Sequence, residues 1–258
     1  MHRARKRFGQ NFLQDNGVIH TIVNLIHPTA DTHIIEIGPG LGALTRPLLA
    51  NLEHLDLLEI DRDLVAYWQQ QNLPGLNVIE GDALQFDFAE WAKQRTPDQS
   101  KCKVVGNLPY NISSPLLFHL VEAANVIDEQ VFMLQAEVVE RMVSKAGGSE
   151  FSRLSVMLQA RYDMELVLEV PPEAFDPQPK VNSAVVRMIP RKDFNLSDTQ
   201  WKALEKVVAA AFSQRRKMLR TNLSAYAERL SLTESELKAR AQDISVDRYI
   251  EWAKTLAT

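Results

Sequence analysis

The sequence predicts an α/β protein with a mostly parallel sheet that has an antiparallel edge, followed by a small all-helical C-terminal domain. Three observations predict this class. Short apolar runs alternate with segments of helical length, two later runs follow each other without a helix between them, and no strand candidate lies beyond residue 195. The 258 residues, 45% of them hydrophobic, can bury a substantial core. We therefore divide the chain into domains at residues 1–190 and 191–258.

Five apolar runs bounded by turn residues predict five strands, at residues 33–38, 55–60, 76–82, 103–108 and 131–135. Helical segments lie between them, such as residues 63–71 and 114–124. The second of these is expected to open with Ser114 as its N-cap and Pro115 in the first helical position. Alternation of strand and helix predicts a parallel sheet. The runs at 165–170 and 183–189 lack an intervening helix and predict an antiparallel pair at one edge.

The C-terminal segment carries helix signals only. Capping boxes at Ser197 to Gln200 and at Thr233 to Glu236 introduce two helices. An apolar stripe with helical spacing follows the first box, and we expect it to be core rather than a ligand site. Its residues are Trp201, Leu204, Val208 and Phe212.

Charge and composition exclude several classes. Residues 187–258 carry a net charge of +5 and the rest −9, so a basic segment that meets an anion is expected, although a solvated helix face is an equal alternative. The six histidines lack the spacing of a zinc site, so no metal is predicted. Cys102, the one cysteine, is expected to be a buried structural thiol. No apolar run approaches the ~20 residues of a membrane span, and a secretion signal is absent, which indicates a cytoplasmic protein.

A glycine loop, "EIGPGLGALT" at residues 36–45, lies between the first predicted strand and the next helix. Gly38, Gly40 and Gly42 allow a tight turn and close approach of a nucleotide-like ligand. The spacing also fits the dinucleotide pattern, and Glu59 ends the second strand, where an acid would bind ribose hydroxyls. A dehydrogenase is therefore one interpretation of the loop.

Two acids favour an adenosine cofactor without a pyrophosphate. Glu36 precedes the glycines and Asp82 ends the third strand. A carboxylate at the first turn would repel phosphates but tolerate the cationic sulfonium and amino group of S-adenosylmethionine, and Asp82 could accept from the adenine amine. The alternative is that both acids cap the helices that follow.

The stretch "NLPY" at residues 107–110 ends the fourth strand and fits transfer of a methyl group to an exocyclic amine. Asn107 Oδ1 could accept from the amine, and Pro109 could fix the turn so that the carbonyl of Leu108 points the same way. Tyr110 offers a face on which a base can stack. A plain strand-ending turn with a core tyrosine is the alternative.

Seven stretches, in this order, resemble the KsgA/RsmA-type small-subunit ribosomal RNA adenine dimethyltransferases. They are "RKRFGQNFL" (5–13), "EIGPGLGALT", "LEID" (58–61), "GDAL" (81–84), "GNLPYNISSPLLFHL" (106–120), "FDPQPKVNSAVV" (175–186) and "AFSQRRKMLRTNL" (211–223). The sequence departs from the family pattern at Gln178, where proline is frequent, and at Ser213, where asparagine is frequent. The resemblance implies a Rossmann-like class I methyltransferase sheet that binds S-adenosyl-L-methionine.

The resemblance also implies the roles of individual residues. Tyr110 and Phe175 would sandwich a flipped adenine. Asn107, Leu108 and Pro109 would form the catalytic turn beside that base. The residues expected to contact the cofactor are Asn11, Leu13, Gly38, Gly40, Glu59, Ile60, Asp82, Ala83 and Asn107. The placement of charge, rather than the resemblance, predicts that two basic clusters bind rRNA phosphates, with solvated surface charge as the alternative for each: Arg3, Arg5, Lys6 and Arg7, and Arg215, Arg216, Lys217 and Arg220.

The implied product is a pair of adjacent N6,N6-dimethyladenosines in the 3′-terminal hairpin of 16S rRNA, formed in late assembly by a monomer acting on a pre-30S particle. Two rivals stay open. The related large-subunit rRNA methyltransferases that give macrolide resistance share the glycine loop and a similar Asn-x-Pro-Tyr stretch, but their tails should differ. The second rival is a nucleic-acid-binding scaffold that keeps the fold but has lost catalysis. The intact "NLPY" stretch argues against this loss.

Overall fold

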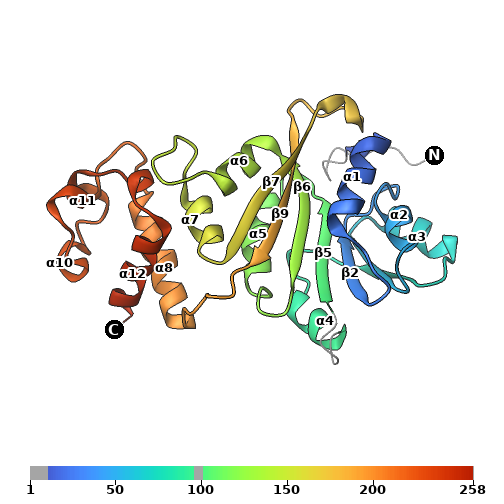
Figure 1. Ribbon diagram of the computed structural model, residues 1–258, viewed down its shortest axis with the longest axis horizontal. Coiled ribbons are helices and arrows are strands. Elements are labelled where there is room, and N and C mark those ends of the chain that lie inside the picture. The colour runs from blue at the N-terminus through green and yellow to red at the C-terminus, as the bar shows by residue number, and fades with distance from the viewer. Residues whose placement is uncertain (1–10, 96–100, 258) are drawn as a thin grey trace. The chain divides into compact units, whose positions relative to one another are not determined.

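A seven-stranded sheet is the framework of the protein, which we describe from a computed structural model over residues 11–95 and 101–257 (Figure 1). The strand order is β4-β3-β2-β5-β6-β9-β7. All pairs from β4 to β6 are parallel, and β9 runs antiparallel to β6. The strands are β2 (Thr32–Ile37), β3 (Leu55–Glu59), β4 (Leu76–Glu80), β5 (Lys101–Asn107), β6 (Glu129–Gln135), β7 (Tyr162–Val170) and β9 (Ser183–Pro190).

This sheet confirms the predicted class: the five predicted parallel strands form, and an antiparallel edge follows them. The central strands are buried on both faces, which explains why their sequences are continuous apolar runs rather than alternating ones. The connecting helices are α1 (Asn16–Ile26), α2 (Thr45–Leu49), α3 (Arg62–Gln71), α4 (Phe88–Arg95), α5 (Ser113–Val121), α6 (Ala136–Val143) and α7 (Arg153–Gln159).

The start of α5 corrects the expected cap. The helix begins at Ser113, its N-cap is Ile112 without a side-chain bond, and Pro115 is its third residue. The turn before it is closed by the Ile112 amide, which donates to the Pro109 carbonyl at 3.2 Å, and this turn runs directly into the helix. Ser114 is therefore not needed as a cap.

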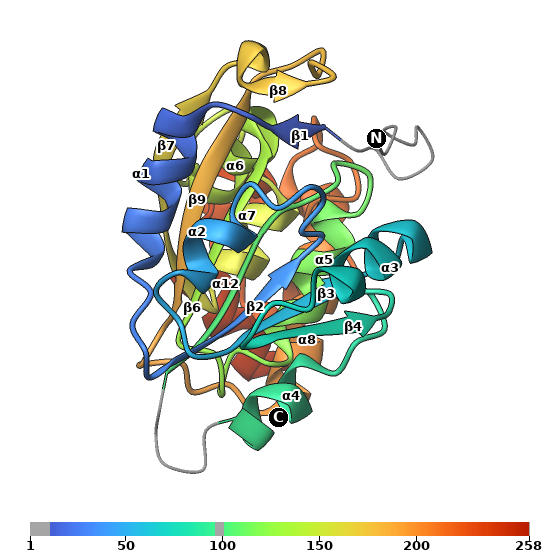
Figure 2. The ribbon, with the colours of Figure 1, turned by 90° about the vertical axis from the view of Figure 1, so that its right-hand side faces the viewer.

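Two very short strands form a second sheet that the sequence did not predict. β1 (Phe12–Leu13) pairs antiparallel with β8 (Phe175–Asp176), and Figure 2 shows the two side by side. A 3-10 turn, Pro172–Ala174, leads into β8, and the Ala174 carbonyl accepts from the Gln14 amide at 2.8 Å. The chain near residue 12 is thus tied to the segment before β9.

The chain divides into two compact units. The first holds the described residues up to Val139 together with Glu165–Pro190, and the second holds Glu140–Met164 and the residues from Arg191 onward. The second unit contains α7 because this helix packs on α8 and α12. Its other helices are α8 (Asp198–Ala211), α9 (Leu219–Asn222), α10 (Ala227–Leu230), α11 (Glu234–Lys238) and α12 (Val246–Leu256). Separate functions for residues 1–190 and 191–258 remain a prediction.

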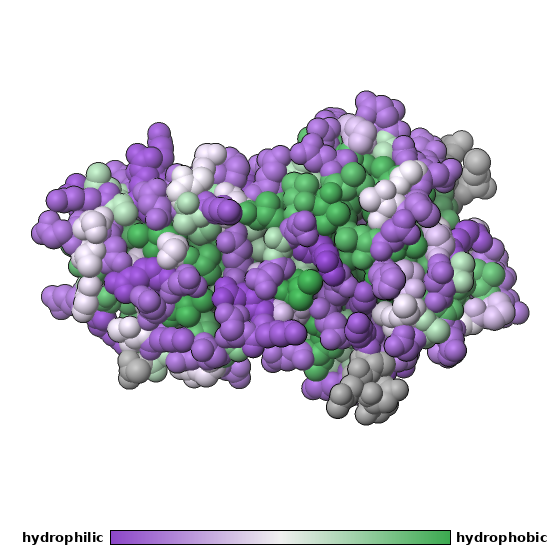
Figure 3. Space-filling view, viewed as in Figure 1, coloured by the Kyte–Doolittle hydropathy of each residue, from purple (hydrophilic) through white to green (hydrophobic). Residues whose placement is uncertain are grey.

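Both predicted capping boxes form, at the starts of α8 and α11. The apolar stripe of α8 is core: Leu204 and Val208 are fully buried, and the ring of Phe212 stacks on Tyr249 at a centroid distance of 6.0 Å. Surface apolar groups remain, as on any folded protein. Figure 3 shows some of them over the edge strand β7, where Leu168 is half-buried. No helix in the described ranges is long and apolar enough to cross a bilayer.

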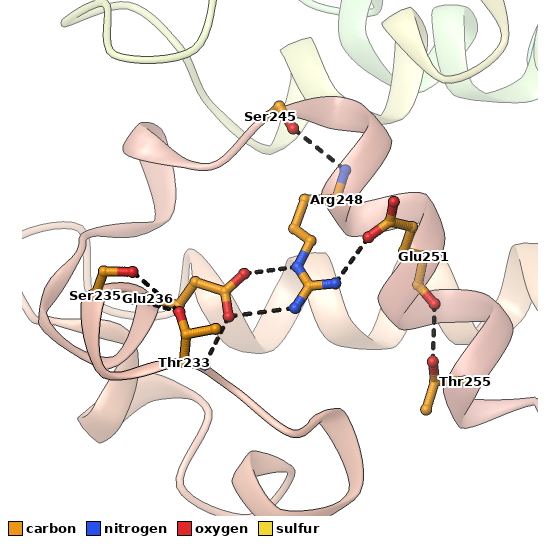
Figure 4. A network of polar contacts seen from close by, with 7 residues as sticks. All are labelled: Thr233, Ser235, Glu236, Ser245, Arg248, Glu251 and Thr255. Carbon is orange, nitrogen blue, oxygen red and sulfur yellow. Dashed lines mark hydrogen bonds and ion pairs between the residues drawn. The ribbon is translucent and has the colours of Figure 1, made fainter.

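An ion-pair network joins α11 to α12 in the second unit (Figure 4). The Arg248 guanidinium donates to Glu236 from Nε at 2.6 Å and from Nη2 at 3.3 Å, and to Glu251 from Nη1 at 2.7 Å. The carboxylate of Glu236 is only 14% exposed and also accepts from the Thr233 amide at 2.8 Å. The hydrogen bond from Arg248 lowers the pKa of Glu236, so the pair stabilises the unit while this carboxyl is ionised.

Replacing Arg248 by methionine is expected to lower the free energy of unfolding at pH 7 by about 1.5–3 kcal/mol, the contribution typical of hydrogen bonds between charged groups. Because the folded-state pKa of Glu236 is depressed, this contribution is present above the unfolded value and is lost as the pH falls through the lower, folded one. The wild type and variant should therefore converge in acid. Urea unfolding between pH 7 and pH 3 tests this.

Lys238→Met is the matched control, since its pair with Glu234 is exposed on both sides and should contribute less than ~1 kcal/mol. Equal losses in the two variants, or a loss for Arg248→Met that persists unchanged at pH 3, would contradict the assignment.

Candidate active site

One cavity of about 260 Å³ lies at the carboxyl ends of β2, β3 and β5, where an open α/β sheet places its ligands. Its walls come from five segments, near residues 11–13, 36–44, 58–64, 81–84 and 107–112. All nine residues that the resemblance assigns to the cofactor line it, and so do the four residues of "NLPY". The structure thus places them together, while their contacts with ligands remain a prediction.

The glycine loop is held against the ring of Trp68 in α3. Gly42 has φ +93°, and a Cβ there would lie 2.4 Å from Cη2 of Trp68. The indole Nε1 donates to the carbonyl of Gly40 at 3.0 Å. A side chain at position 42 would collide with this buried ring, and together with the positive φ this explains the glycine there.

Glu36 is buried inside β2, one residue before the strand ends. Burial raises its pKa to about 8; the hydrogen bond from Thr45 Oγ1 at 2.7 Å opposes this and the charge of Glu59 adds to it. For Glu36, the alternative interpretation as a helix cap is therefore wrong: its carboxyl accepts from the Thr45 hydroxyl, and the N-terminus of α2 has no side-chain cap. Asp82 does serve its own turn, because Oδ1 accepts from the Leu84 amide at 2.9 Å.

Glu59 ends β3 with a carboxylate that its own loop orients. Oε1 accepts from the amides of Ile60 at 2.9 Å and Asp61 at 2.8 Å. Burial raises its pKa, and the hydrogen bonds from these backbone amides oppose the rise. A carboxylate fixed in this way at a strand end can accept from two neighbouring hydroxyls.

Glu59→Ala is expected to weaken binding of S-adenosylmethionine roughly 10- to 150-fold, since hydrogen bonds to a charged group contribute about 1.5–3 kcal/mol. Calorimetric titration measures the effect. Glu80→Ala is the control, because Glu80 ends the adjacent strand but is paired with Arg62 on the surface. Unchanged affinity in Glu59→Ala, or tighter binding of NAD than of S-adenosylmethionine by the wild type, would refute the assignment.

The orientation of the Asn107 amide is set by the segment before β1. Asn107 Nδ2 donates to the backbone carbonyl of Asn11 at 3.0 Å. With Nδ2 committed there, the acceptor that this side chain can offer to a substrate is Oδ1. Asn11 is itself held, because its Nδ2 donates to the carbonyl of Pro177 at 2.7 Å.

The turn after Asn107 is braced at several points. The Leu108 amide donates to the Met133 carbonyl at 3.1 Å, and Ser113 Oγ donates to the Pro109 carbonyl at 3.1 Å. Tyr110 is half-buried, with its hydroxyl 2.7 Å from Ser183 Oγ. Burial raises the pKa of Tyr110 and the hydrogen bond with Ser183 opposes the rise, so the phenol keeps its proton at neutral pH.

Phe175 occupies a different environment from Tyr110. It is 3% exposed, lies in the same apolar cluster as Leu13 and Val185, and is not among the residues that line the cavity. β8 places it opposite Leu13. The sandwich of an adenine between Tyr110 and Phe175 therefore remains a prediction.

The basic clusters are placed only in part. Arg3, Arg5, Lys6 and Arg7 lie outside the described residues. Arg215, Arg216, Lys217 and Arg220 are exposed in the second unit, and Arg215 donates to the Ser149 carbonyl. Within the described ranges no three His, Cys, Asp or Glu side chains are grouped so that they could hold a metal ion.

The sequence analysis did not identify the groups that hold the side chains and strands of the site in place. Ser183 and the Asn11 carbonyl hold Tyr110 and Asn107, and Gly106 lets β5 approach β2. A serine at the start of a strand and a backbone carbonyl carry no sequence signal for such roles. Gly106 does, because a glycine within an apolar strand indicates close approach of another backbone.

Comparisons with known proteins show the family of the chain. Residues 1–258 match the family described as ribosomal RNA adenine dimethylase. The chain is 54% identical to ribosomal RNA small subunit methyltransferase A of Burkholderia ambifaria, covering 99% of this chain and 95% of that protein. It is 49% identical to the protein of the same name from Dechloromonas aromatica, covering 99% of both.

Solved structures show the same fold. A dimethyladenosine transferase from Plasmodium falciparum superposes with a TM-score of 0.77 at 23% identity, covering 93% of this chain and 95% of that one. The 23S rRNA methyltransferase ErmE superposes with a TM-score of 0.70 at 23% identity, covering 96% of this chain and 100% of that one. Because the family match and the curated relatives span essentially the whole sequence, the chain belongs to the ribosomal RNA adenine dimethylase family.

Proposed function

We propose that the protein transfers methyl groups from S-adenosylmethionine to N6 of two adjacent adenosines in the 3′-terminal hairpin loop of 16S rRNA during late small-subunit biogenesis. The family establishes the enzyme class, an S-adenosylmethionine-dependent rRNA adenine dimethyltransferase. The two nucleotides, the pre-30S particle as substrate and action as a monomer are the finer parts of the proposal. A cytoplasmic location belongs with them, since bacterial ribosomes assemble there.

One observation carries the proposal: the oriented amide of Asn107 shares a cavity with the glycine loop and with Glu59. An acceptor aimed by a neighbouring carbonyl is suited to an uncharged amine, which presents only N–H donors. The glycine loop and the strand-end carboxylate supply a site for an adenosine beside it.

The cavity fits S-adenosylmethionine better than a dinucleotide. Glu36 and Glu59 both line it and are 2% and 5% exposed. Burial raises the pKa of both carboxyls. The positive charges of a sulfonium and an amino group would favour their ionised forms, whereas the negative charges of a pyrophosphate would disfavour them. When bound, S-adenosylmethionine supplies an electrophilic methyl group.

The protein's own groups make the amine reactive. The lone pair of adenine N6 is delocalised into the ring, so acceptors that hold its N–H bonds favour a more tetrahedral nitrogen. Asn107 Oδ1 is one such acceptor, and the Leu108 carbonyl is proposed as the second. Two hydrogen bonds keep this turn rigid, one from the Leu108 amide to the Met133 carbonyl and one from the Ser113 hydroxyl to the Pro109 carbonyl. The acceptors therefore do not reorganise during the reaction.

Titration of the purified protein with labelled S-adenosylmethionine and ribosomal particles tests the proposal. Small subunits that lack the adenine dimethylation should take up label at N6 of two adjacent adenosines. Large subunits and fully modified small subunits are the controls. Label in 23S rRNA would assign the protein to the macrolide-resistance activity, and binding of small subunits without any transfer would indicate a scaffold.

The proposal also gives a role to the exposed cations of the second unit. Replacing Arg215, Arg216 and Lys217 together by alanine should weaken binding to small subunits and flatten its dependence on salt. Each lost phosphate contact lowers the slope of log affinity against log salt by nearly one unit. The affinity for S-adenosylmethionine should be unchanged. Filter binding at several salt concentrations gives the slope.

A triple replacement of Lys202, Lys206 and Lys238 by alanine removes the same charge from exposed positions of the same unit and is the control. An equal change of slope in both triple variants would mean that only net charge matters. An unchanged slope in the first variant would leave its three residues as solvated surface charges.

A further inference from the structure

We propose that Ser183 is a positioning residue for methyl transfer: its buried hydroxyl holds the ring of Tyr110 at the wall of the cavity, in the orientation that receives the target base. The inference rests on the proposed function, because it assigns Tyr110 to the substrate base. It adds a residue that lies outside the cavity and acts only through its neighbour.

The contact itself joins distant parts of the chain. Tyr110 Oη lies 2.7 Å from Ser183 Oγ, 73 residues further along. Tyr110 lines the cavity, and Ser183 is absent from its lining. Ser183 is fully buried. Its hydroxyl therefore meets the tyrosine and not a ligand in the cavity.

Ser183 lies in the sheet, whereas Tyr110 lies in the turn after Asn107. Ser183 begins β9 and is paired with Gln135 of β6, and the carbonyl of the preceding Asn182 accepts from the Ala136 amide at 2.9 Å. Tyr110 has no strand partner and follows Pro109 in the loop between β5 and α5. The hydrogen bond between the Tyr110 and Ser183 hydroxyls links this loop to the sheet and restrains the orientation of the phenol ring.

Such a restraint matters for a stacking platform. A ring that must receive an extruded base loses conformational freedom on binding unless it is already fixed, and misplacement of a reacting group is costly in rate. Burial raises the pKa of Tyr110, so the phenol keeps its proton and this hydrogen bond is present at neutral pH. The expected role is preorganisation of the base, which affects the rate of transfer more than the binding of cofactor.

A double-mutant cycle with Ser183→Ala and Tyr110→Phe tests the proposal. Either change removes the same hydrogen bond, so each should lower kcat roughly 2- to 13-fold, the range equivalent to one neutral bond. The double variant should be no slower than the slower single variant. The dissociation constant for S-adenosylmethionine and the KM for unmodified small subunits should stay at their wild-type values.

Ser155→Ala is the matched control, because Ser155 is equally buried and its hydroxyl donates to the Arg141 carbonyl in the second unit. It should cost stability without changing kcat. Effects of Ser183→Ala and Tyr110→Phe that multiply, or a kcat for Tyr110→Phe equal to that of the wild type, would overturn the proposal, and the second result does so even if Ser183→Ala fails to fold. Failure of the wild-type protein to methylate small subunits would instead refute the proposed function.

Discussion

Asn107→Ala should fold but transfer methyl groups about 10²-fold more slowly than the wild type, or slower still, even at saturating S-adenosylmethionine. Loss of a preorganised polar contact in an active site typically has this effect. The structure gives the reason: Nδ2 is committed to the Asn11 carbonyl, so Oδ1 is the acceptor that this side chain can offer to a substrate. Single-turnover assays at saturating cofactor measure the change.

Asn111→Ala is the matched control, because Asn111 carries the same amide in the same cavity wall but is exposed. It should retain most of the activity. Near-wild-type transfer by Asn107→Ala, or an equal loss in both variants, would remove the role given to Asn107.

Gly106→Ala is expected to reduce methyl transfer to about 1% or less and to destabilise the protein by roughly 1–3 kcal/mol. A Cβ at residue 106 would lie 2.5 Å from the carbonyl oxygen of Ile37, so β5 and β2 would have to separate. Ile37 leads into the glycine loop and Gly106 precedes Asn107, so both walls of the cavity would move. A displacement of about 1 Å at a reacting centre can cost 10²-fold. Urea unfolding and the transfer assay measure the two effects.

Gly147→Ala separates this clash from a general cost of replacing glycine. Unlike Gly106, which lies in β5, Gly147 lies in a loop with φ +89°, and a Cβ there would meet nothing within 4 Å. It should lose stability through backbone strain alone and keep normal kinetics. Normal cofactor affinity and turnover in Gly106→Ala would show that the strands can separate without affecting the site.

The sheet could be predicted from the sequence because local patterns determine it. Each central strand is a continuous apolar run, and alternation with helices dictates parallel strands whose carboxyl ends meet at one edge. The place of the cavity followed from that rule. β1 and β8 could not be predicted in the same way, since two residues carry no periodicity and their pairing depends on contacts between distant segments.

The side chains of the site were predictable by type, but their orientation was not. Glycines at a turn, an acid at a strand end and an amide before proline each have a local meaning. The direction of the Asn107 amide depends on a backbone carbonyl, a group that every residue has, so the sequence offers no sign of it. The burial of Phe175 likewise depends on the partners of β8 rather than on its own neighbours in the sequence.

The tie between Asn11 and Pro177 sets an order of events during synthesis. These residues are 166 positions apart, and at roughly 5–20 residues per second the second is added roughly 8 to 33 seconds after the first. Until then Asn11, whose carbonyl accepts from the Asn107 amide, lacks its hydrogen bond to Pro177, although Asn107 and the glycine loop have already been made. A nascent chain can thus form the parallel strands β2 to β6 before the segment that orients the Asn107 amide is tied in place.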